Sequence, residues 1–166
     1  MSLLIGLFGG TFDPPHIGHL ILSAEKRTQL GLDRLLWILT PNPPHKQRQG
    51  ITALEHRLAM VKLAISDEPG FELSTIEVDR PGPQFALDTV KIIAEQNPAA
   101  DLVYLMGGDS LRDLPAWKRP TDLVAALRAL SERGFTRVFA EGGAQIASSL
   151  VADDLIDEVV IFRAHV

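Results

Sequence analysis

The sequence predicts an α/β fold, namely a single Rossmann-like domain of three layers around a mostly parallel sheet of five to six strands. Short apolar runs alternate with helix-length periodic segments along all 166 residues. A glycine-rich turn separates the first apolar run from the first helical segment, as in folds that bind phosphate at a helix N-terminus. Hydrophobic residues make up 46% of the chain, which is enough for one continuous core over residues 1–166.

Each predicted strand is a short run rich in Leu, Ile, Val or Phe. These runs cover residues 3–8, 34–39, 71–78, 102–106, 137–140 and 158–162. Helical periodicity occupies residues 19–30, 53–65, 86–95, 122–132 and 145–151. Because parallel strands need crossover connections, helices should cover both faces of the sheet. We expect the order 3-2-1-4-5 for the first five strands.

Composition and charge narrow the function classes. The net charge of −5 argues against a general nucleic-acid-binding surface. The chain has no cysteine, which excludes disulfides, a thiolate nucleophile and a cysteine-based zinc site. No signal peptide and no apolar stretch of about 18 residues is visible, so we expect a cytoplasmic protein without a membrane partner. The sequence does not indicate the oligomeric state.

Residues 9–19 carry the strongest functional signal in the chain. This stretch follows the first predicted strand and ends in His-Ile-Gly-His at the start of a helix. His16 and His19 are three residues apart, so they face the same side of the first helical turn. The unpaired N–H groups and the positive dipole end of that turn suit phosphate oxygens.

Glycines in the same stretch let a ligand lie close to the backbone. Gly9 and Gly10 end the strand, and Gly18 lies in the first helical turn. Together with Thr11 and Phe12, they predict a binding site for a nucleotide triphosphate. The two imidazoles are then the side-chain donors for the reacting phosphate.

The sequence Gly-Gly-Thr-Phe-Asp-Pro-Pro-His-Ile-Gly-His, with its HIGH motif, resembles the signature of the nucleotidylyltransferases. In detail it is similar to bacterial nicotinate-nucleotide adenylyltransferases. Further matching segments are residues 40–46, 56–60, 76–80, 106–110 and 114–120, so the resemblance covers residues 1–120. It implies that ATP and nicotinate mononucleotide react to give deamido-NAD and pyrophosphate, with Mg²⁺ carried by the ATP phosphates.

The resemblance also implies which residues bind the nucleotide. His16 and His19 would hydrogen-bond the phosphates in the transition state; the alternative is two helix-start histidines satisfied by backbone. Gly107, Gly108 and Asp109 would form a strand-end turn against adenine and ribose; the alternative is a plain turn. No residue is predicted to ligate a metal directly.

Three further residues are expected to contact the substrates. Lys46 would pair with a phosphate, Arg57 would bind substrate near a helix start, and Trp117 would stack on the pyridine ring. The alternatives are a solvated loop lysine, a surface salt bridge for Arg57 and a merely packed tryptophan.

One departure lies inside the matching part. Gln84-Phe85-Ala86 stands where the family often has Ser-Tyr-Thr, which removes hydroxyls expected near the nicotinate carboxylate. The neighbouring Asp88 and Thr89 are retained and are expected to bind substrate.

Residues 121–166 depart from that family. The Ser/Thr-rich turn near an Ile-Arg pair, which supplies ATP-phosphate contacts in the family, is missing. Residues 130–144 and 155–164 instead resemble the dihydrofolate-reductase-like reductase domain of bifunctional riboflavin-biosynthesis proteins. In that family a Gly-Gly turn, here Gly142 and Gly143, contacts the NADPH phosphates. We expect a structural turn here and no NADPH binding, because other cofactor-binding elements are missing.

We interpret the chain as an engineered chimera in which a reductase fragment, 121–166, completes the sheet of a transferase part, 1–120. Its site would be incomplete and its activity weak or absent, since the arginine contact to ATP is lost. The alternative is a natural divergent transferase with an unusual C-terminus. Two other readings of function stay open: a structural chimera without catalysis, and a pyridine-nucleotide reductase or binder.

Overall fold

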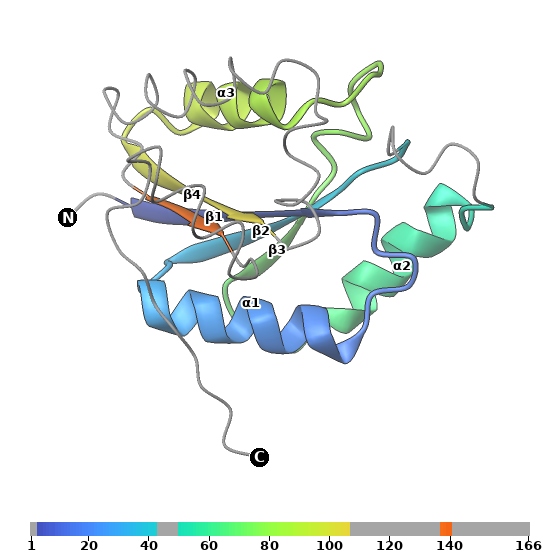
Figure 1. The fold of residues 1–166 in the computed structure, drawn as a ribbon, viewed down its shortest axis with the longest axis horizontal. Helices are drawn as coiled ribbons and strands as arrows, with labels where there is room; N and C mark the ends of the chain where they lie inside the picture. The colour runs from blue at the N-terminus through green and yellow to red at the C-terminus, as the bar shows by residue number, and fades with distance from the viewer. Residues whose placement is uncertain (1–2, 43–49, 107–136, 141–166) are drawn as a thin grey trace, which may run out of the picture.

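The computed structural model describes residues 3–42, 50–106 and 137–140. Its centre is a parallel sheet (Figure 1). The strands are β1 (Leu3–Gly10), β2 (Arg34–Leu39), β3 (Phe71–Ser74), β4 (Ala100–Met106) and β5 (Arg137–Ala140). The order β3-β2-β1-β4 confirms the order predicted for the first four strands, and the backbone of β5 runs parallel beside β4.

Helices cover both faces of the sheet. α1 (Ile17–Leu30) and α2 (Leu54–Ala64) lie on one face, and α3 (Ala86–Gln96) lies on the other (Figure 1). The expected helices at 122–132 and 145–151 and the expected strand at 158–162 lie outside the described residues.

Two apolar cores follow from the alternation of side chains along the strands. Phe8 of β1 and Trp37 of β2 belong to the core under α1 and α2. Ile5 and Leu7 of β1 belong to the core under α3, together with Ile93 of that helix. The middle of β1 is buried on both faces because α1 and α2 cover one face of the sheet and α3 covers the other, while β2 and β4 pair with its two edges (Figure 1).

Two predicted boundaries are corrected by local hydrogen bonds. β3 ends at Ser74, not at residue 78, because the chain turns there. The Asp79 N–H donates to the Thr75 carbonyl at 2.9 Å, and the Thr75 hydroxyl donates to the Asp79 carboxylate at 2.7 Å. α1 begins at Ile17, two residues early, because His16 is its N-cap.

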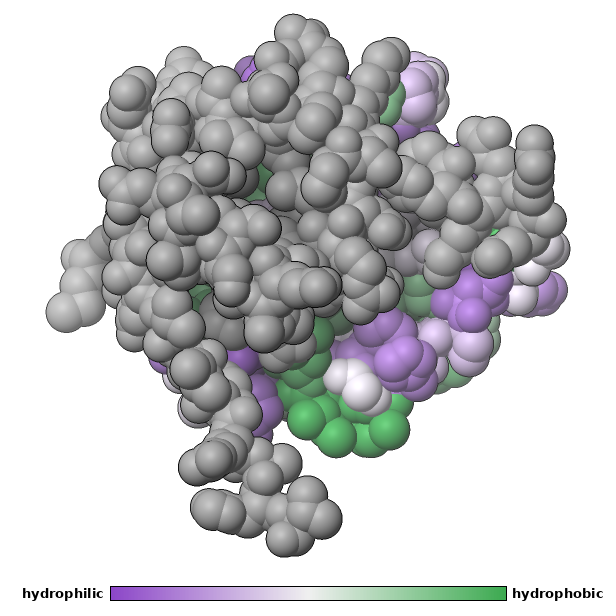
Figure 2. Space-filling model, in the orientation of Figure 1, coloured by the Kyte–Doolittle hydropathy of each residue, from purple (hydrophilic) through white to green (hydrophobic). Residues whose placement is uncertain are grey.

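The visible surface of the described residues has both hydrophobic and hydrophilic areas. Figure 2 shows hydrophobic surface low in the view, on the side of α1, next to hydrophilic surface. Ile17 and Ile21 of α1 are exposed apolar side chains. Among the residues that the structure describes, no helix has both the length and the apolar character needed to span a membrane.

Candidate functional site

The two histidines lie together at the start of α1, just beyond the carboxyl end of β1. His16 is the N-cap with an extended backbone, and His19 is the third residue of the helix. Their rings stack with centroids 3.7 Å apart and an interplanar angle of 26°. The first turn of α1 contains no acidic residue, so no carboxylate of that turn competes with an anion for the helix dipole.

A hydrogen bond sets which nitrogen of His19 carries the proton. The His16 backbone N–H donates to Nδ1 of His19 at 3.1 Å. Because Nδ1 accepts, the neutral ring carries its hydrogen on Nε2. His19 can therefore offer an N–H donor at Nε2, which is the group that a phosphate oxygen requires.

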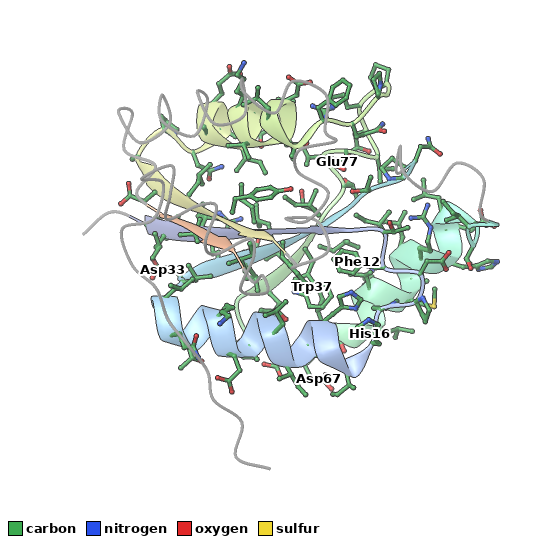
Figure 3. The ribbon with its side chains drawn as sticks, in the orientation of Figure 1. Phe12, His16, Asp33, Trp37, Asp67 and Glu77 are labelled. Atoms are coloured by element: carbon green, nitrogen blue, oxygen red, sulfur yellow. The ribbon has the colours of Figure 1, made fainter. Side chains whose placement is uncertain are left out.

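Aromatic side chains support His19 from the core. The Phe12 ring meets the His19 ring edge-on at 5.2 Å and lies 4.9 Å from the Trp37 ring. Figure 3 shows Phe12, His16 and Trp37 on the α1 side of the sheet. Phe12 is only 2% exposed, so a nucleotide contact predicted for this residue would have to come from its backbone.

Two glycines of the motif make room for neighbouring rings. A Cβ on Gly10 would lie 2.9 Å from the Phe12 ring, and a Cβ on Gly18 would lie 3.1 Å from the His16 ring. A Cβ on Gly9 would meet only the Tyr104 hydroxyl, at an ordinary 3.4 Å. A Cβ at residue 10 would therefore force the buried Phe12 ring to move, and a Cβ at residue 18 would displace the exposed His16 ring, apart from any ligand.

Arg57 lies in the interior, and the surface salt bridge considered for it is wrong. Its side chain is 2% exposed. Nη1 donates to the carbonyls of Thr11 and Thr40 at 3.0 and 2.9 Å. Nη2 donates to the Pro41 carbonyl at 2.8 Å, and Nε donates to the Thr52 carbonyl at 2.9 Å. Arg57 therefore joins the loop after β1 to the loop after β2, a role that sequence reasoning missed.

The electrostatic surroundings of Arg57 follow from this position. Burial lowers the pKa of the Arg57 guanidinium, and the negative charge of Asp13 opposes that shift. Asp13 also accepts a hydrogen bond from the Thr52 N–H at 2.8 Å. An arginine starts from so high a pKa that it stays charged, so the loops enclose a permanent cation.

Asp88 and Thr89 lie apart from the histidines, at the start of α3. Asp88 is exposed, whereas Thr89 is 1% exposed. The Thr89 hydroxyl donates to the Glu77 carboxylate at 2.7 Å and accepts from Arg80 Nη2 at 3.2 Å. Figure 3 shows Glu77 on the α3 side of the sheet, opposite His16. Sequence reasoning missed this buried network. Its only signal in the sequence was the pair Glu77 and Arg80, three residues apart in the segment after β3.

Tyr104 of β4 is a neighbour of that network. Burial raises the pKa of the Tyr104 phenol, and the nearby charge of Glu77 raises it further. Tyr104 is therefore a neutral hydroxyl at any physiological pH.

Several predicted site residues lie outside the described residues. They are Lys46, Gly107, Gly108, Asp109, Trp117, Gly142 and Gly143. Their predicted roles stay predictions.

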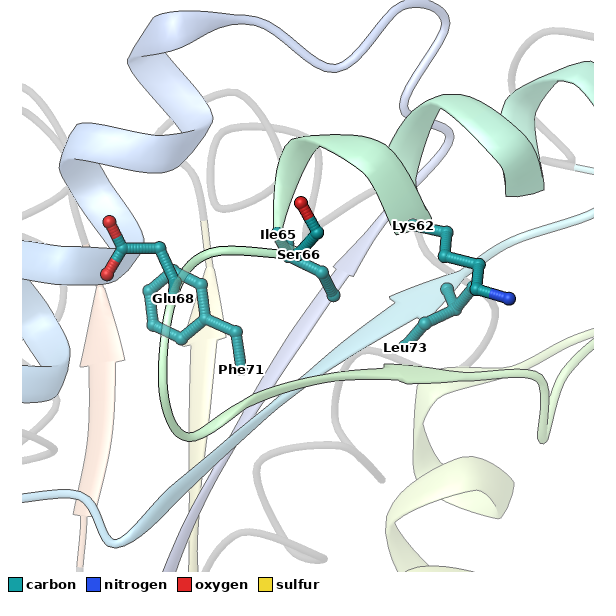
Figure 4. A pocket seen from close by; sticks show the side chains of 6 residues that line it. All are labelled: Lys62, Ile65, Ser66, Glu68, Phe71 and Leu73. Carbon is teal, nitrogen blue, oxygen red and sulfur yellow. The ribbon is translucent and has the colours of Figure 1, made fainter.

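A surface hollow of about 460 Å³ lies between the end of α2 and β3 (Figure 4). It is lined by Lys62, Ile65, Ser66, Glu68, Phe71 and Leu73. No predicted site residue lines it. Among the residues that the structure describes, no three His, Cys, Asp or Glu side chains are grouped so that they could hold a metal ion.

Comparison with known proteins identifies relatives of this chain. The family model described as cytidylyltransferase-like matches residues 7–152, which extends beyond residue 120. The chain is 42% identical over 120 residues to the nicotinate-nucleotide adenylyltransferase of Bacillus subtilis. It is 44% identical over 128 residues to a "probable nicotinate-nucleotide adenylyltransferase" of Gloeobacter violaceus. These matches cover 72% and 77% of this chain, and the chain spans 64% and 62% of the two relatives.

Solved structures share the fold at low sequence identity. A Plasmodium falciparum nicotinic acid mononucleotide adenylyltransferase complexed with NaAD superposes with a TM-score of 0.66 at 16% identity. The match covers 86% of this chain and 76% of that one. The complex of that enzyme with APC gives a TM-score of 0.62, also at 16% identity, over 86% and 75% of the two chains. With the Rossmann-type sheet and the histidine pair in place, the match over residues 7–152 shows that the chain belongs to the cytidylyltransferase-like family.

Proposed function

We propose that the chain transfers the adenylyl group of ATP to nicotinate mononucleotide, forming deamido-NAD and pyrophosphate. The observation that carries this proposal is the stacked pair of His16 and His19 at the N-terminus of α1, just beyond Gly9 and Gly10 at the end of β1. The relatives named as nicotinate-nucleotide adenylyltransferases support it, as do neighbours of the same fold complexed with NaAD and with APC.

The reaction needs positioning and charge neutralisation more than covalent help. A phosphate oxygen of the mononucleotide attacks the α-phosphorus of ATP and forms a new P–O bond. The bond between that phosphorus and the oxygen bridging to the β-phosphate breaks, and pyrophosphate leaves with the electron pair. His16 and His19 would donate hydrogen bonds to phosphate oxygens as negative charge develops there. Mg²⁺, arriving on the ATP phosphates, would neutralise part of that charge.

A coupled assay of pyrophosphate release tests the proposal. Release should require both ATP and nicotinate mononucleotide, and it should depend on the histidines. Replacing either histidine by alanine should lower kcat by about 10²–10³, the usual cost of one preorganised donor. His56→Ala is the matched control, because His56 is exposed on α2. Equal rates for the His19→Ala and His56→Ala variants would refute the role of the pair.

The choice of pyridine substrate is part of the same proposal. Gln84 is buried, and its Nε2 donates to the Arg80 carbonyl at 3.2 Å, so its side chain belongs to the loop before α3. Running the assay with nicotinate mononucleotide and with its amide as alternative acceptors decides the substrate. The proposal requires the acid to give the higher kcat/KM.

We further propose that residues 121–166 derive from a reductase, so that the chain is a chimera of reduced activity. The matches to the Thermomicrobium roseum and Gloeobacter violaceus relatives span 116 and 128 of the 166 residues, so part of the chain has no counterpart in those alignments. The family match up to residue 152 favours the alternative of a natural divergent transferase. A turnover rate equal to that of the Bacillus subtilis relative would refute the proposal that this chain has reduced activity. An NADPH titration tests the reductase reading, for which we expect no binding.

A further inference from the structure

Arg57 fixes the direction of one peptide group in the loop after β1. Its Nη1 donates at 3.0 Å to the Thr11 carbonyl, which belongs to the same peptide group as the Phe12 N–H. The bond between Thr11 and Phe12 is trans, so the carbonyl and the N–H point in opposite directions. The Phe12 N–H therefore points away from Arg57.

The backbone of Phe12 shows that this direction is held against a preference of the residue. Phe12 has a φ of 48°, a left-handed conformation that costs free energy for a bulky side chain. Turning the peptide group by half a revolution would give a negative φ and leave the Phe12 ring nearly in place. The turn would exchange the positions of the Thr11 carbonyl and the Phe12 N–H. Arg57 opposes the turn, because its Nη1 donor would then face another donor.

The strand order indicates where the Phe12 N–H points. The same Nη1 also donates at 2.9 Å to the carbonyl of Thr40, the residue after β2. The Thr11 carbonyl is therefore directed toward the β2 side of β1, and the Phe12 N–H toward the β4 side. The order β3-β2-β1-β4 reverses between β1 and β4, and α/β sheets bind ligands beyond the carboxyl ends of such a strand pair.

The Phe12 N–H has no hydrogen-bond acceptor among the described residues. Because Phe12 is only 2% exposed, an N–H left without an acceptor there would cost free energy. The guanidinium also strengthens this donor, since a charged group bound to a carbonyl polarises the peptide group that carries it. An anionic oxygen, such as a phosphate oxygen, gains most from a donor of this kind.

We infer that Arg57 is a positioning residue for the Phe12 N–H: by holding the Thr11 carbonyl it directs that N–H toward the carboxyl ends of β1 and β4, as a donor to a phosphate oxygen. Only the identification of this phosphate with ATP rests on the proposed function. Lysine cannot replace the guanidinium, because one ammonium nitrogen cannot reach the four carbonyls that Nε, Nη1 and Nη2 bind together.

A unique dipeptide makes the test specific. Thr11-Phe12 is the only Thr-Phe pair in the sequence. Protein labelled with ¹³C at threonine carbonyls and ¹⁵N at phenylalanine therefore gives one carbonyl-to-amide NMR signal, which reports this peptide group alone. Saturating inorganic tripolyphosphate should move the Phe12 amide proton downfield in wild type. An amide proton that does not move would overturn the inference.

The role of the guanidinium is tested by comparing Arg57→Lys with Arg34→Lys. Arg34 is a matched control because its guanidinium also makes two hydrogen bonds, to Glu72, at the opposite end of β2. In Arg57→Lys the peptide group can turn, so the Phe12 proton should lose most of its downfield shift at saturation. Arg34→Lys should keep the whole shift. An unchanged shift in a folded Arg57→Lys protein would contradict the positioning role.

A second amide separates this role from general damage to the site. His16-Ile17 is the only His-Ile pair, so the same labelling scheme isolates the Ile17 N–H at the start of α1. That amide should respond to tripolyphosphate equally in wild type and in Arg57→Lys. An equal loss at Ile17 and Phe12 would refute a specific effect on Phe12.

A second variant covers the case in which Arg57→Lys does not fold. Arg57→Gln buries a neutral amide, which costs less than an ammonium group, and should lose the Phe12 shift in the same way. The wild-type response to tripolyphosphate needs no variant, so it tests the inference in either case.

Kinetics separates this inference from the proposed function. If the chain is an adenylyltransferase, Arg57→Lys should lower kcat by about 10²–10³, the usual cost of one preorganised donor, with little change in the KM for nicotinate mononucleotide. Full turnover in Arg57→Lys would overturn the inference and leave the proposed function standing. A wild-type chain without turnover, whose Phe12 signal still responds to tripolyphosphate only when Arg57 is present, upholds the positioning role and refutes the proposed function.

Discussion

At residue 18, the first turn of α1 leaves room for the His16 ring because the residue is glycine. The nearest ring atoms of His16, Cε1 and Nδ1, would lie 3.1 Å from an added Cβ, closer than carbon atoms normally pack. The ring is exposed and can move, but moving it changes its stacking on His19. A substitution at residue 18 is therefore expected to change both the stability of the helix and the position of the His16 ring.

We predict that Gly18→Ala stabilises the fold and impairs the site. Alanine is favoured over glycine in a helix by up to about 1 kcal/mol, so the free energy of unfolding in urea should rise. The displaced His16 ring should lower kcat by roughly tenfold or more. Gly50→Ala is the control, because a Cβ at Gly50 meets nothing within 4 Å. A variant with unchanged kcat would show that the position of the His16 ring does not matter.

Arg57 is a residue whose type and position in the sequence led to a wrong expectation about its contacts. An arginine near a helix start beside a predicted phosphate site suggests a ligand contact. Here its donors bind backbone carbonyls of loops distant in sequence. That choice depends on how β1 and β2 end side by side, which no local pattern encodes.

At the scale of elements, α3 is held to the loop after β3 by a buried hydroxyl. Thr89 satisfies one oxygen of the Glu77 carboxylate, and both side chains are more than nine-tenths buried. The helix therefore depends on a polar contact inside an otherwise apolar layer.

We predict that Thr89→Val lowers the free energy of unfolding by about 1–3 kcal/mol, because it leaves a buried carboxylate without this donor. Urea denaturation measures the loss. Thr28→Val, at an exposed threonine of α1, should change it far less. Adding Glu77→Gln to Thr89→Val should recover part of the loss, since a neutral amide costs less to bury. No recovery would indicate that packing around Thr89, not the charge of Glu77, sets the cost.

The ion pair of Arg34 and Glu72 joins β2 to β3 and predicts a pH dependence. Hydrogen bonds from Arg34 hold the pKa of the Glu72 carboxyl below its ordinary value of 4.5, although burial opposes this. A lowered folded-state pKa means that the stabilisation is present above the ordinary value and is lost as pH falls through the lowered one.

Both side chains are more than a third exposed, so we expect the pair to contribute only about 0.2–1 kcal/mol. Between neutral pH and about pH 3, wild type should lose more stability than Glu72→Gln. Glu95→Gln, at an exposed carboxylate of α3, serves as the control and should follow wild type. Parallel pH curves for wild type and Glu72→Gln would refute the coupling.

At the scale of the whole molecule, binding of ATP should stabilise the fold. At a free concentration of about 100 times Kd, a ligand of the folded state adds about 2.7 kcal/mol. For a chain of this size that corresponds to a rise in Tm of about 5–11 °C. Thermal unfolding with Mg²⁺ and ATP measures the rise, which should largely disappear in the His16→Ala, His19→Ala double variant. An equal rise in that variant would place the nucleotide elsewhere.

The sequence alone locates the first four strands because buried parallel strands are continuous apolar runs separated by helical periods, and their order follows from the Rossmann-like fold class that this alternation indicates. It places β2 at residues 34–39, as found. It extends β3 too far, because Ile76 and Val78 continue the strand-like alternation while a Thr75–Asp79 turn ends the strand.

Only part of the candidate site can be predicted from the sequence. The histidine pair follows from local spacing, since residues three apart on a helix meet. The left-handed Phe12, the buried Arg57 and the Glu77–Thr89 contact are not predictable from spacing, because each is fixed by segments far apart in the chain.

The hydrogen bond that fixes the tautomer of His19 has a consequence for acid conditions. If Nδ1 were to gain a proton, it could no longer accept the His16 N–H, and the N-cap of α1 would lose this partner. Protonation of this imidazole would therefore cost the start of the helix one hydrogen bond, while the backbone bonds from His19 and Leu20 to the His16 carbonyl do not depend on it. A ring that accepts at Nδ1 carries its hydrogen on Nε2, so the bond from His16 fixes the direction in which the neutral ring can donate.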